Sequence, residues 1–331
     1  MKRFNVFNLG ILKEEDGFKE LESCSDGFHK KNHDGVKFII TTGDKKVEFI
    51  CYENYTIAYV KSSIGYPAYY PVHNTKLKRP VKAVLMDLDG TSVKSESFWI
   101  WIIQLTVCSL LGRDDFTFEE ADQPYVSGHS VSEHLQYCIN KYCPDKSLEE
   151  ARKYYFMHTK YEMNEIMEGR GKADAFTPSN RVKEFLLALK KRSIKIGLVT
   201  SGLYEKAWPE IVSAFKTLDM GDPKEFYDAS ISAGFPLGKG KVGTLGELSP
   251  KPHPWLYAET CTIGLNIPFR QRHHVVGIED SGAGVCSIKL AGYTTIGITG
   301  GNIEASGTKG LCDFYANDFD EILKFITNEE D

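Results

Sequence analysis

The chain has 331 residues and a formal net charge of −5, and 42% of its residues are hydrophobic and 26% charged. These values are ordinary for a globular protein with a sizeable core and room for two or three domains. A weakly acidic chain has no general attraction to nucleic acid, and the most apolar helical segment, residues 98–111, is too short for a membrane span. Nucleic acid and membrane are therefore excluded as expected partners.

The N-terminus and the cysteines indicate the compartment. Met1-Lys2-Arg3 is basic, but Asn5 and Asn8 interrupt the segment that follows, so it lacks the pattern of a secretory signal. The eight cysteines are scattered without a Cys-x-x-Cys pair, and no histidine pattern near Cys138 and Cys143 supports a zinc site. We expect reduced thiols in a cytoplasmic protein.

Residues 1–80 are predicted to form a small β-rich module. Three short β-type runs occupy residues 36–40, 47–51 and 56–60, with a turn signal at residues 42–44. Tyrosines gather toward the end of the module, at Tyr52, Tyr55, Tyr59, Tyr66, Tyr69 and Tyr70. They fit a ligand platform or packing against the neighbouring domain, and we favour the packing. The sequence assigns this module no function.

From residue 81 strands alternate with helices, which is typical of an α/β fold with a parallel sheet. The expected strands cover residues 81–87, 194–200, 274–278, 294–298 and 313–316. The expected helices cover residues 180–191, 205–215, 254–264, 282–291 and 318–326. A helix-rich segment, residues 95–175, interrupts this rhythm with helices expected at 98–111, 130–141 and 147–167. Ser147 and Glu150 match a capping box at the start of the last one.

Two carboxylates come directly after the first strand. The apolar run Val84-Leu85-Met86 ends in Asp87-Leu88-Asp89-Gly90-Thr91. Residues i and i+2 of a strand point the same way, so Asp87 and Asp89 face one small volume at the edge where parallel sheets bind ligands. Two close anions repel each other unless a cation lies between them, which predicts a hard ion such as Mg²⁺.

Three later stretches complete this pattern. A strand ends in the hydroxyls of Thr200 and Ser201 before Gly202, and hydroxyls with free backbone N–H groups suit phosphate oxygens. Lys251 stands between two prolines as a constrained cation, and the pair Glu279-Asp280 follows another strand. Each stretch alone has an ordinary explanation, such as a helix cap, a surface lysine or a turn. Their shared order and strand-end placement predict one site for phosphate and metal.

This order of motifs resembles the haloacid dehalogenase superfamily over residues 81–325. It is most similar to the branch of small phosphatases and β-phosphoglucomutases with a helical cap. The resemblance implies an α/β fold with a Rossmann-like, three-layer parallel-sheet core formed by residues 81–94 and 176–331. It also implies a helical cap, residues 95–175, inserted into that core. The β-rich module at residues 1–80 lies outside the resemblance.

The resemblance implies the catalytic roles as well. Asp87 is the nucleophile that forms an aspartyl phosphate, and Asp89 protonates the leaving oxygen and later helps to deprotonate water. Thr200 holds the phosphoryl group, and Lys251 balances the charge of Asp87 and of the phosphoryl oxygens.

The same resemblance implies metal and substrate contacts. Mg²⁺ is held by Asp87, by the backbone carbonyl of Asp89 and by Asp280, with Glu279 in support. Substrate contacts are expected from Gly90, Thr91, Ser201 and Gly202, and from Gly128 and His129 in the cap. His129 fits a structural or solvent-facing role equally well.

Departures from the family pattern separate its activities. Asp89 argues against a dehalogenase or a phosphonate hydrolase, because both lack an acid at this place, although Lys94 is a candidate for the lysine of the latter. The mutase pattern has an arginine where Val131 stands, and its absence weakens the case for a second phosphate clamp. Lys94-Ser95 and Trp255 also depart from the pattern without touching the core chemistry.

We therefore predict an Mg²⁺-dependent phosphatase that acts on a small phosphomonoester, with a sugar phosphate favoured by the resemblance. A β-phosphoglucomutase-like mutase is the alternative. A binding or regulatory module on an inactive scaffold is the alternative from another class, and the intact set of reactive residues argues against it. The sequence does not predict the oligomeric state.

Overall fold

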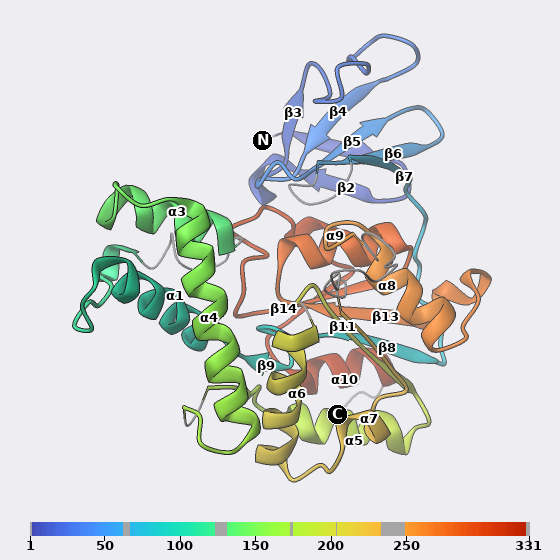
Figure 1. The fold of residues 1–331 in the computed structure, drawn as a ribbon. Coiled ribbons are helices and arrows are strands. Elements are labelled where there is room, and N and C mark those ends of the chain that lie inside the picture. Colours follow the sequence, from blue (N-terminus) through green and yellow to red (C-terminus); the bar gives the residue numbers. More distant parts are fainter. Residues whose placement is uncertain are drawn as a thin grey trace, which may run out of the picture. The chain divides into compact units, whose positions relative to one another are not determined.

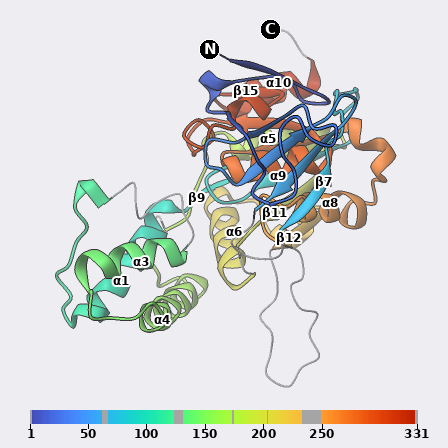
Figure 2. The same ribbon diagram turned by 90° about the horizontal axis from the view of Figure 1, so that it is seen from above.

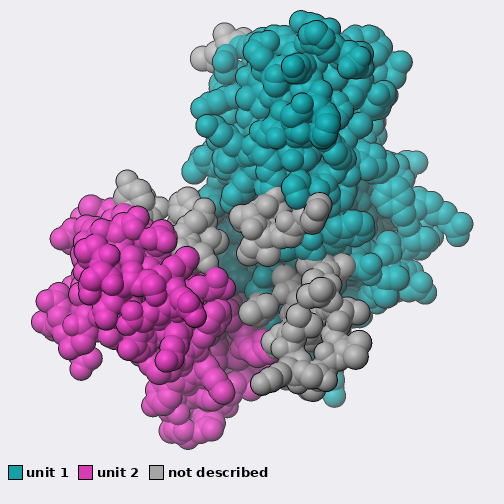
Figure 3. Space-filling view, turned by 45° about the horizontal axis from the view of Figure 1, so that its top comes forward, with its two compact units in different colours: residues 1–92, 179–204, 222–331 teal, residues 93–178, 205–221 magenta. Residues whose placement is uncertain are grey.

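The computed structural model of the chain describes residues 2–61, 67–122, 131–172, 175–202, 204–232 and 249–328. These residues fall into two compact units, coloured separately in Figure 3. Unit 1 contains residues 1–92, 179–204 and 222–331, and unit 2 contains residues 93–178 and 205–221. The boundary expected near residue 80 lies inside unit 1, and residues 205–221 join the helical segment in unit 2.

A parallel sheet forms the core of unit 1, in the order β12-β11-β8-β13-β14-β15 within the described residues (Figure 1). Its strands are β8 (Ala83–Asp87), β11 (Lys195–Thr200), β12 (Ala229–Ser232), β13 (Val275–Glu279), β14 (Thr294–Ile298) and β15 (Phe314–Ala316). Every residue of the central strands β8, β13 and β14 is buried, because both faces of the sheet are covered. β8 lies between β11 and β13, which confirms the predicted α/β fold.

Helices cover both faces of this sheet (Figure 1). On one face lie α8 (Trp255–Glu259), the π-helical turn Thr260–Gly264 and α9 (Gly282–Ala291). On the other face lie α5 (Val182–Lys191) and α10 (Phe319–Thr327), which pack through Phe185 and Phe319. The short helix α7 (Pro223–Phe226) comes in the chain directly after residues 205–221 of unit 2. Short 3₁₀ turns are found at Glu14–Asp16, Phe269–His274 and Lys309–Leu311. The helix expected at 254–264 therefore changes its hydrogen-bonding pattern after Glu259.

The described residues between Lys2 and Pro71 form two antiparallel sheets. β1 (Arg3–Val6) pairs with β2 (Gly10–Lys13). The larger sheet has the order β3 (Lys19–Leu21), β4 (Phe38–Thr41), β5 (Val47–Cys51), β6 (Thr56–Val60) and β7 (Ala68–Pro71). One of its faces shares a hydrophobic core with α9, and Figures 1 and 2 show these strands lying over that helix. Phe18, Ile40 and Phe49 meet Val285 and Leu290 in this core.

Unit 2 is helical. It contains α1 (Glu96–Leu111), a 3₁₀ turn at Glu120–Asp122, α3 (Val131–Tyr142), α4 (Leu148–Met167) and α6 (Tyr204–Leu218), whose first residue belongs to unit 1. Strands β9 (Val93–Lys94) and β10 (Thr177–Pro178) pair where the chain enters and leaves the helical segment. Ser147 caps α4 by accepting a hydrogen bond from the backbone N–H of Glu150, as predicted. None of the helices in the described residues is long and apolar enough to cross a membrane.

The tyrosines of the N-terminal module divide between two environments. Tyr70 is 8% exposed and faces the core of unit 1, whereas Tyr69 on the same strand is 45% exposed and Tyr55 is 50% exposed. The predicted packing is therefore found for Tyr70 but not for Tyr69 or Tyr55. Tyr66 lies outside the described residues. All eight cysteines are free thiols.

Candidate active site

Three of the predicted site residues lie at the carboxyl ends of three adjacent strands. Asp87 is the last residue of β8, Thr200 ends β11 and Glu279 ends β13. The chain leaves β8 for β11 on one side and reaches β13 on the other, so the strand order reverses at β8. Such a reversal opens a crevice at the sheet edge, where α/β proteins bind ligands.

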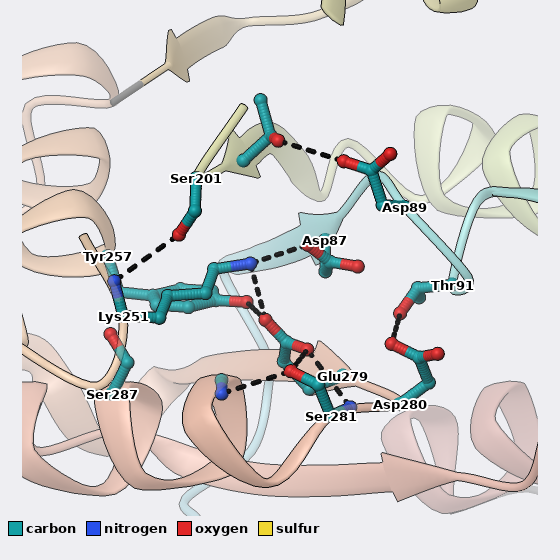
Figure 4. A network of polar contacts seen from close by, with 12 residues as sticks. Asp87, Asp89, Thr91, Ser201, Lys251, Tyr257, Glu279, Asp280, Ser281 and Ser287 are labelled. Carbon is teal, nitrogen blue, oxygen red and sulfur yellow. Dashed lines mark hydrogen bonds and ion pairs between the residues drawn. The ribbon is translucent and has the colours of Figure 1, made fainter. Parts of the chain in front are cut away.

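Lys251 joins two of these strand ends (Figure 4). Its Nζ atom lies 2.5 Å from Oδ1 of Asp87 and 2.5 Å from Oε1 of Glu279. The Lys251 side chain is 7% exposed, and those of Asp87 and Glu279 are 5% and 0% exposed. A buried charge is tolerated when it is paired, and here one cation is paired with two carboxylates. The backbone N–H of Lys251 also donates to Oγ of Ser201 at 3.3 Å.

Glu279 is held by further donors from the protein. The hydroxyl of Tyr257 in α8 donates to Oε1 at 2.7 Å, and the hydroxyl of Ser281 donates to Oε2 at 2.9 Å. Ser281 also caps α9 by accepting from the backbone N–H of Gly284. Glu279 is thus occupied on both oxygens by protein groups. Neither oxygen of Glu279 is therefore open to a metal ion. The arrangement indicates that Glu279 orients Lys251.

Asp280 stands close to the turn that follows β8. The hydroxyl of Thr91 donates to Oδ1 of Asp280 at 3.3 Å. Gly90 has a φ of +84°, and a Cβ atom there would lie 2.1 Å from Oδ2 of Asp280. Only glycine meets both requirements without strain. The glycine in the Asp-x-Asp-Gly-Thr stretch therefore allows the turn to pass directly over this carboxylate.

Asp89 and Thr200 meet on the other side of Asp87. The hydroxyl of Thr200 donates to Oδ2 of Asp89 at 3.2 Å and accepts from the backbone N–H of Gly202 at 2.9 Å. Asp89 is half-buried, whereas Asp87 is 3% exposed. Of two carboxylates one residue apart, one is thus enclosed and the other lies nearer to solvent.

Burial and crowding shift the acid–base properties of the site. Burial, followed by the nearby charge of Glu279, raises the pKa of Asp87 well above its usual value, although Lys251 opposes the change. The same two causes raise the pKa of Asp280 to about 7. Burial lowers the pKa of Lys251, but its contacts with Asp87 and Glu279 outweigh burial and raise the pKa overall. The lysine is therefore a cation, and the carboxylates crowd one another.

The donor set fits a hard divalent cation. Carboxylate oxygens of Asp87, Glu279 and Asp280 lie within 4.8 Å of one another. Oδ2 of Asp87 is buried and has no hydrogen-bond partner among the described residues. A buried carboxylate oxygen without a partner is costly, and oxygen donors are the ligands that Mg²⁺ prefers. Because Lys251 occupies Oδ1, the open oxygen of Asp87 and the carboxylate of Asp280 are the ligands best suited to the ion.

Most of the residues singled out in the sequence come together here. The exceptions are Gly128 and His129, which lie outside the described residues. Sequence reasoning missed Tyr257 and Ser92, whose hydroxyl donates to the backbone carbonyl of Asp87 at 2.5 Å. Ser92 follows the acidic stretch directly and carried a local signal. Tyr257 carried none, because its hydroxyl meets Glu279 only through the packing of α8 beside β13.

Several solved structures share the fold of this chain. A predicted phosphoglycolate phosphatase from Haemophilus somnus matches with 18% identity and a TM-score of 0.56, covering 75% of this chain and 98% of its own. A Thermotoga maritima protein with a provisional assignment as a β-phosphoglucomutase matches with 20% identity and a TM-score of 0.52, covering 75% and 100%. A variant of CbbY from Rhodobacter sphaeroides, in complex with xylulose-1,5-bisphosphate, matches with 17% identity and a TM-score of 0.51, covering 73% and 96%.

The family is shown by a sequence model. No curated protein sequence matches the chain. The family model of haloacid dehalogenase-like hydrolases matches residues 81–292, which include every described strand-end residue of the site. The match begins after the N-terminal sheets, so those sheets lie outside the family model. The chain belongs to the haloacid dehalogenase-like hydrolases.

Proposed function

We propose that this hydrolase is an Mg²⁺-dependent phosphatase that cleaves a small phosphomonoester through an aspartyl phosphate on Asp87. The observation that carries the proposal is the state of the Asp87 carboxylate. One oxygen is paired with Lys251, and the other is buried without a partner in the described part of the chain. Such a carboxylate is enclosed and held in one orientation. A cation bound to it can also contact the oxygens of an incoming phosphate and reduce the repulsion between the two anions.

In the first half-reaction a carboxylate oxygen of Asp87 attacks phosphorus. The new bond joins that oxygen to phosphorus, and the bond from phosphorus to the ester oxygen breaks. Asp89, half-buried beside Thr200, donates a proton to the leaving oxygen, which departs as an alcohol. Lys251 stabilises the negative charge that collects on the phosphoryl oxygens, and the hydroxyl of Thr200 contributes a further hydrogen bond.

In the second half-reaction water attacks the aspartyl phosphate. Asp89 is now a carboxylate and accepts a proton from the water. The bond between phosphorus and Asp87 breaks, which releases inorganic phosphate and restores the carboxylate. One residue thus acts as an acid and then as a base, because the two steps transfer the proton in opposite directions.

The residues that would hold Mg²⁺ are Asp87 and Asp280, together with the backbone carbonyl of Asp89. When bound, Mg²⁺ offsets the charge of the phosphoryl oxygens and of the crowded carboxylates. Glu279 supports the site from behind by fixing Lys251, and Thr91 orients Asp280. Burial and mutual repulsion disfavour the ionised forms of Asp87 and Asp280 and so raise their pKa values. A cation between the two carboxylates would offset this repulsion, which supports the assignment.

For the substrate we propose a sugar phosphate or a similar small monoester. The variant of CbbY, which shares this fold, was solved with a sugar bisphosphate. Backbone and side-chain donors after the two strand ends, at Gly90, Thr91, Ser201 and Gly202, are proposed to contact the phosphate group. Gly128 and His129 are proposed to contact the remainder of the substrate.

The test is release of inorganic phosphate from a panel of sugar phosphates, phosphoglycolate and nucleotides, with and without Mg²⁺. Asp87→Asn removes the nucleophile with little change of volume. Asp320→Asn is the matched control, because Asp320 is an exposed carboxylate that pairs with the exposed Arg181. Turnover that requires both Mg²⁺ and Asp87 supports the proposal. Interconversion of hexose phosphates without release supports the mutase instead, and inactivity in both assays contradicts both.

A further inference from the structure

The N-terminal module reaches the segment that carries Lys251 through one buried tyrosine. The hydroxyl of Tyr70, at the third position of β7, is hydrogen-bonded to Nδ1 of His253 over 2.7 Å. The Tyr70 ring also meets the rings of His253 and Trp255 edge-on, with centroids 5.7 and 6.0 Å away. Tyr70 and His253 are 8% and 1% exposed. The contact is therefore part of the interior of unit 1.

The position of His253 gives this contact its significance. His253 stands two residues after Lys251, and Pro252 lies between them. Its backbone carbonyl accepts from the hydroxyl of Ser287 in α9 at 2.6 Å, and its N–H donates to the carbonyl of Pro250 at 3.1 Å. Backbone contacts thus hold the segment from the side of α9, and the ring holds it from the side of the module.

The Tyr70 hydroxyl is the polar anchor of that ring. Nε2 of His253 is buried and has no hydrogen-bond partner within the described residues, so the ring is tied there only through Nδ1. A buried ring nitrogen that loses its partner pays the full cost of desolvation. Removing the hydroxyl therefore leaves the ring without polar contacts in the described part of the chain and frees it to turn.

The module that presents Tyr70 is firmly joined to the rest of unit 1. Its sheet shares a core with α9, and the backbone N–H of Asp44 donates to the carbonyl of Ser306 at 3.0 Å. Gly17 packs so closely on Gly307 that an added Cβ would lie 2.6 Å from its Cα. A hydroxyl on such a support has a fixed place and can hold another segment in position.

From these contacts we infer that Tyr70 is a positioning residue, which fixes Lys251 against Asp87 through His253. The N-terminal module, outside the family match, thereby becomes part of the catalytic apparatus. The inference rests on the proposed function, because it assumes that Lys251 stabilises the charge of phosphoryl transfer. A misplaced lysine destabilises the transition state more than it weakens substrate binding. We therefore expect a lower kcat and a nearly unchanged KM.

The test compares Tyr70→Phe with Tyr69→Phe. Both remove one hydroxyl from β7, but Tyr69 faces away from the core and donates to Asp26 at 2.7 Å. For Tyr70→Phe we expect kcat to fall roughly 5- to 50-fold with KM within about twofold, because small misplacements of catalytic groups are costly. For Tyr69→Phe we expect both constants to stay within about twofold of the wild-type values. Adding Tyr70→Phe to His253→Ala should cause little further loss, since the hydroxyl acts through the ring.

Hydrogen exchange gives a readout that does not depend on activity. Tyr70→Phe should accelerate amide exchange in residues 251–258, while residues 38–60 of the module keep their protection. Unchanged exchange in 251–258, an unchanged kcat, or loosening of the whole module would overturn the inference. If the wild-type protein releases no phosphate from any substrate, the proposed function fails, and the exchange pattern alone then decides whether Tyr70 positions the Lys251 segment.

Discussion

Nζ of Lys251 lies 2.5 Å from Oδ1 of Asp87, and both side chains are almost completely enclosed. Because the same Nζ also contacts Glu279, one cation connects the ends of β8 and β13. The lysine therefore has two tasks. It neutralises a crowded group of carboxylates in the resting protein, and in the mechanism that we propose it stabilises charge on the phosphoryl group.

Replacement of Lys251 should impair both tasks. We expect Lys251→Met to lower kcat/KM by about 10²- to 10³-fold, the usual loss when one electrostatic contact to a transition state is removed. It should also lower the melting temperature, because Asp87 and Glu279 are then left buried without their partner. Phosphate release and thermal unfolding measure the two effects.

Lys309→Met is the control for that measurement. Lys309 also pairs with a carboxylate, that of Glu304 at 2.7 Å, but both side chains are exposed. Exposed pairs contribute about 0–1 kcal/mol, so this variant should resemble the wild type in both assays. Equal behaviour of the two lysine variants would show that the buried pair has no special role.

Magnesium should stabilise the folded protein as well as activate it. A ligand that binds only the folded state adds about 2.7 kcal/mol at 100 times its dissociation constant. We expect Mg²⁺ to raise the melting temperature of the wild-type protein at constant ionic strength, and EDTA to abolish phosphate release. Asp280→Asn should lose most of this rise and need more Mg²⁺ for activity.

Asp320→Asn provides the comparison, because Asp320 is an exposed acid that pairs with Arg181 on the surface of unit 1. Its response to Mg²⁺ should equal that of the wild type. If Asp280→Asn kept the full thermal response, Asp280 would not be a ligand of the ion.

The strand ends of the site could be predicted because their signals are local. An apolar run that ends in Asp87, Thr200 or Glu279 predicts a buried strand. Its polar last residue also indicates the end of the sheet where the site lies. The missed strands lack that signal for a physical reason. Among them, β3, β7 and β12 are edge strands within the described residues, and edge strands carry polar or proline residues such as Lys19, Glu20 and Pro71.

Contacts between distant segments could not be predicted from local patterns. The Tyr70 hydroxyl and His253 are 183 positions apart in the sequence. In the sequence Tyr70 is one of six clustered tyrosines, and alternation along β7 alone does not say which neighbour turns inward. The environment of Tyr257 depends in the same way on how α8 packs beside β13. Such contacts follow from the fold as a whole.

A buried carboxylate in unit 2 leads to a prediction on stability and pH. Asp122 is 0% exposed and accepts hydrogen bonds from Tyr137, Lys141 and Tyr142, at 2.5, 2.7 and 2.5 Å. Burial alone would raise the pKa of Asp122, but these donors outweigh it and hold the pKa well below its usual range. A carboxylate with a lowered pKa stabilises the fold above its unfolded pKa, near 4, and loses this contribution as pH falls below that value.

Asp122→Asn should therefore destabilise unit 2 by about 2 kcal/mol at neutral pH, because hydrogen bonds to a charged group are lost. The difference from the wild type should shrink as pH falls from about 4 toward 2, since the wild-type contribution is then disappearing. Thermal unfolding across this pH range measures it. Glu119→Gln, which alters an exposed partner of Lys141, should show no such trend, and a constant Asp122→Asn deficit at all pH values would contradict the assignment.

The contact between Gly17 and Gly307 predicts how sensitive the junction of the N-terminal module is to added volume. Gly17 has a φ of +98°. Gly10 has a comparable φ of +83°, but no atom of the described residues lies within 4 Å of a Cβ added there. Gly10→Ala therefore measures backbone strain alone, which costs about 1 kcal/mol. Gly17→Ala adds a clash with the backbone of Gly307 and should cost about 3 kcal/mol in total. Denaturant unfolding of both variants separates the free energy of backbone strain from that of the clash. Equal losses of unfolding free energy would contradict the prediction, because the clash with Gly307 would then cost nothing.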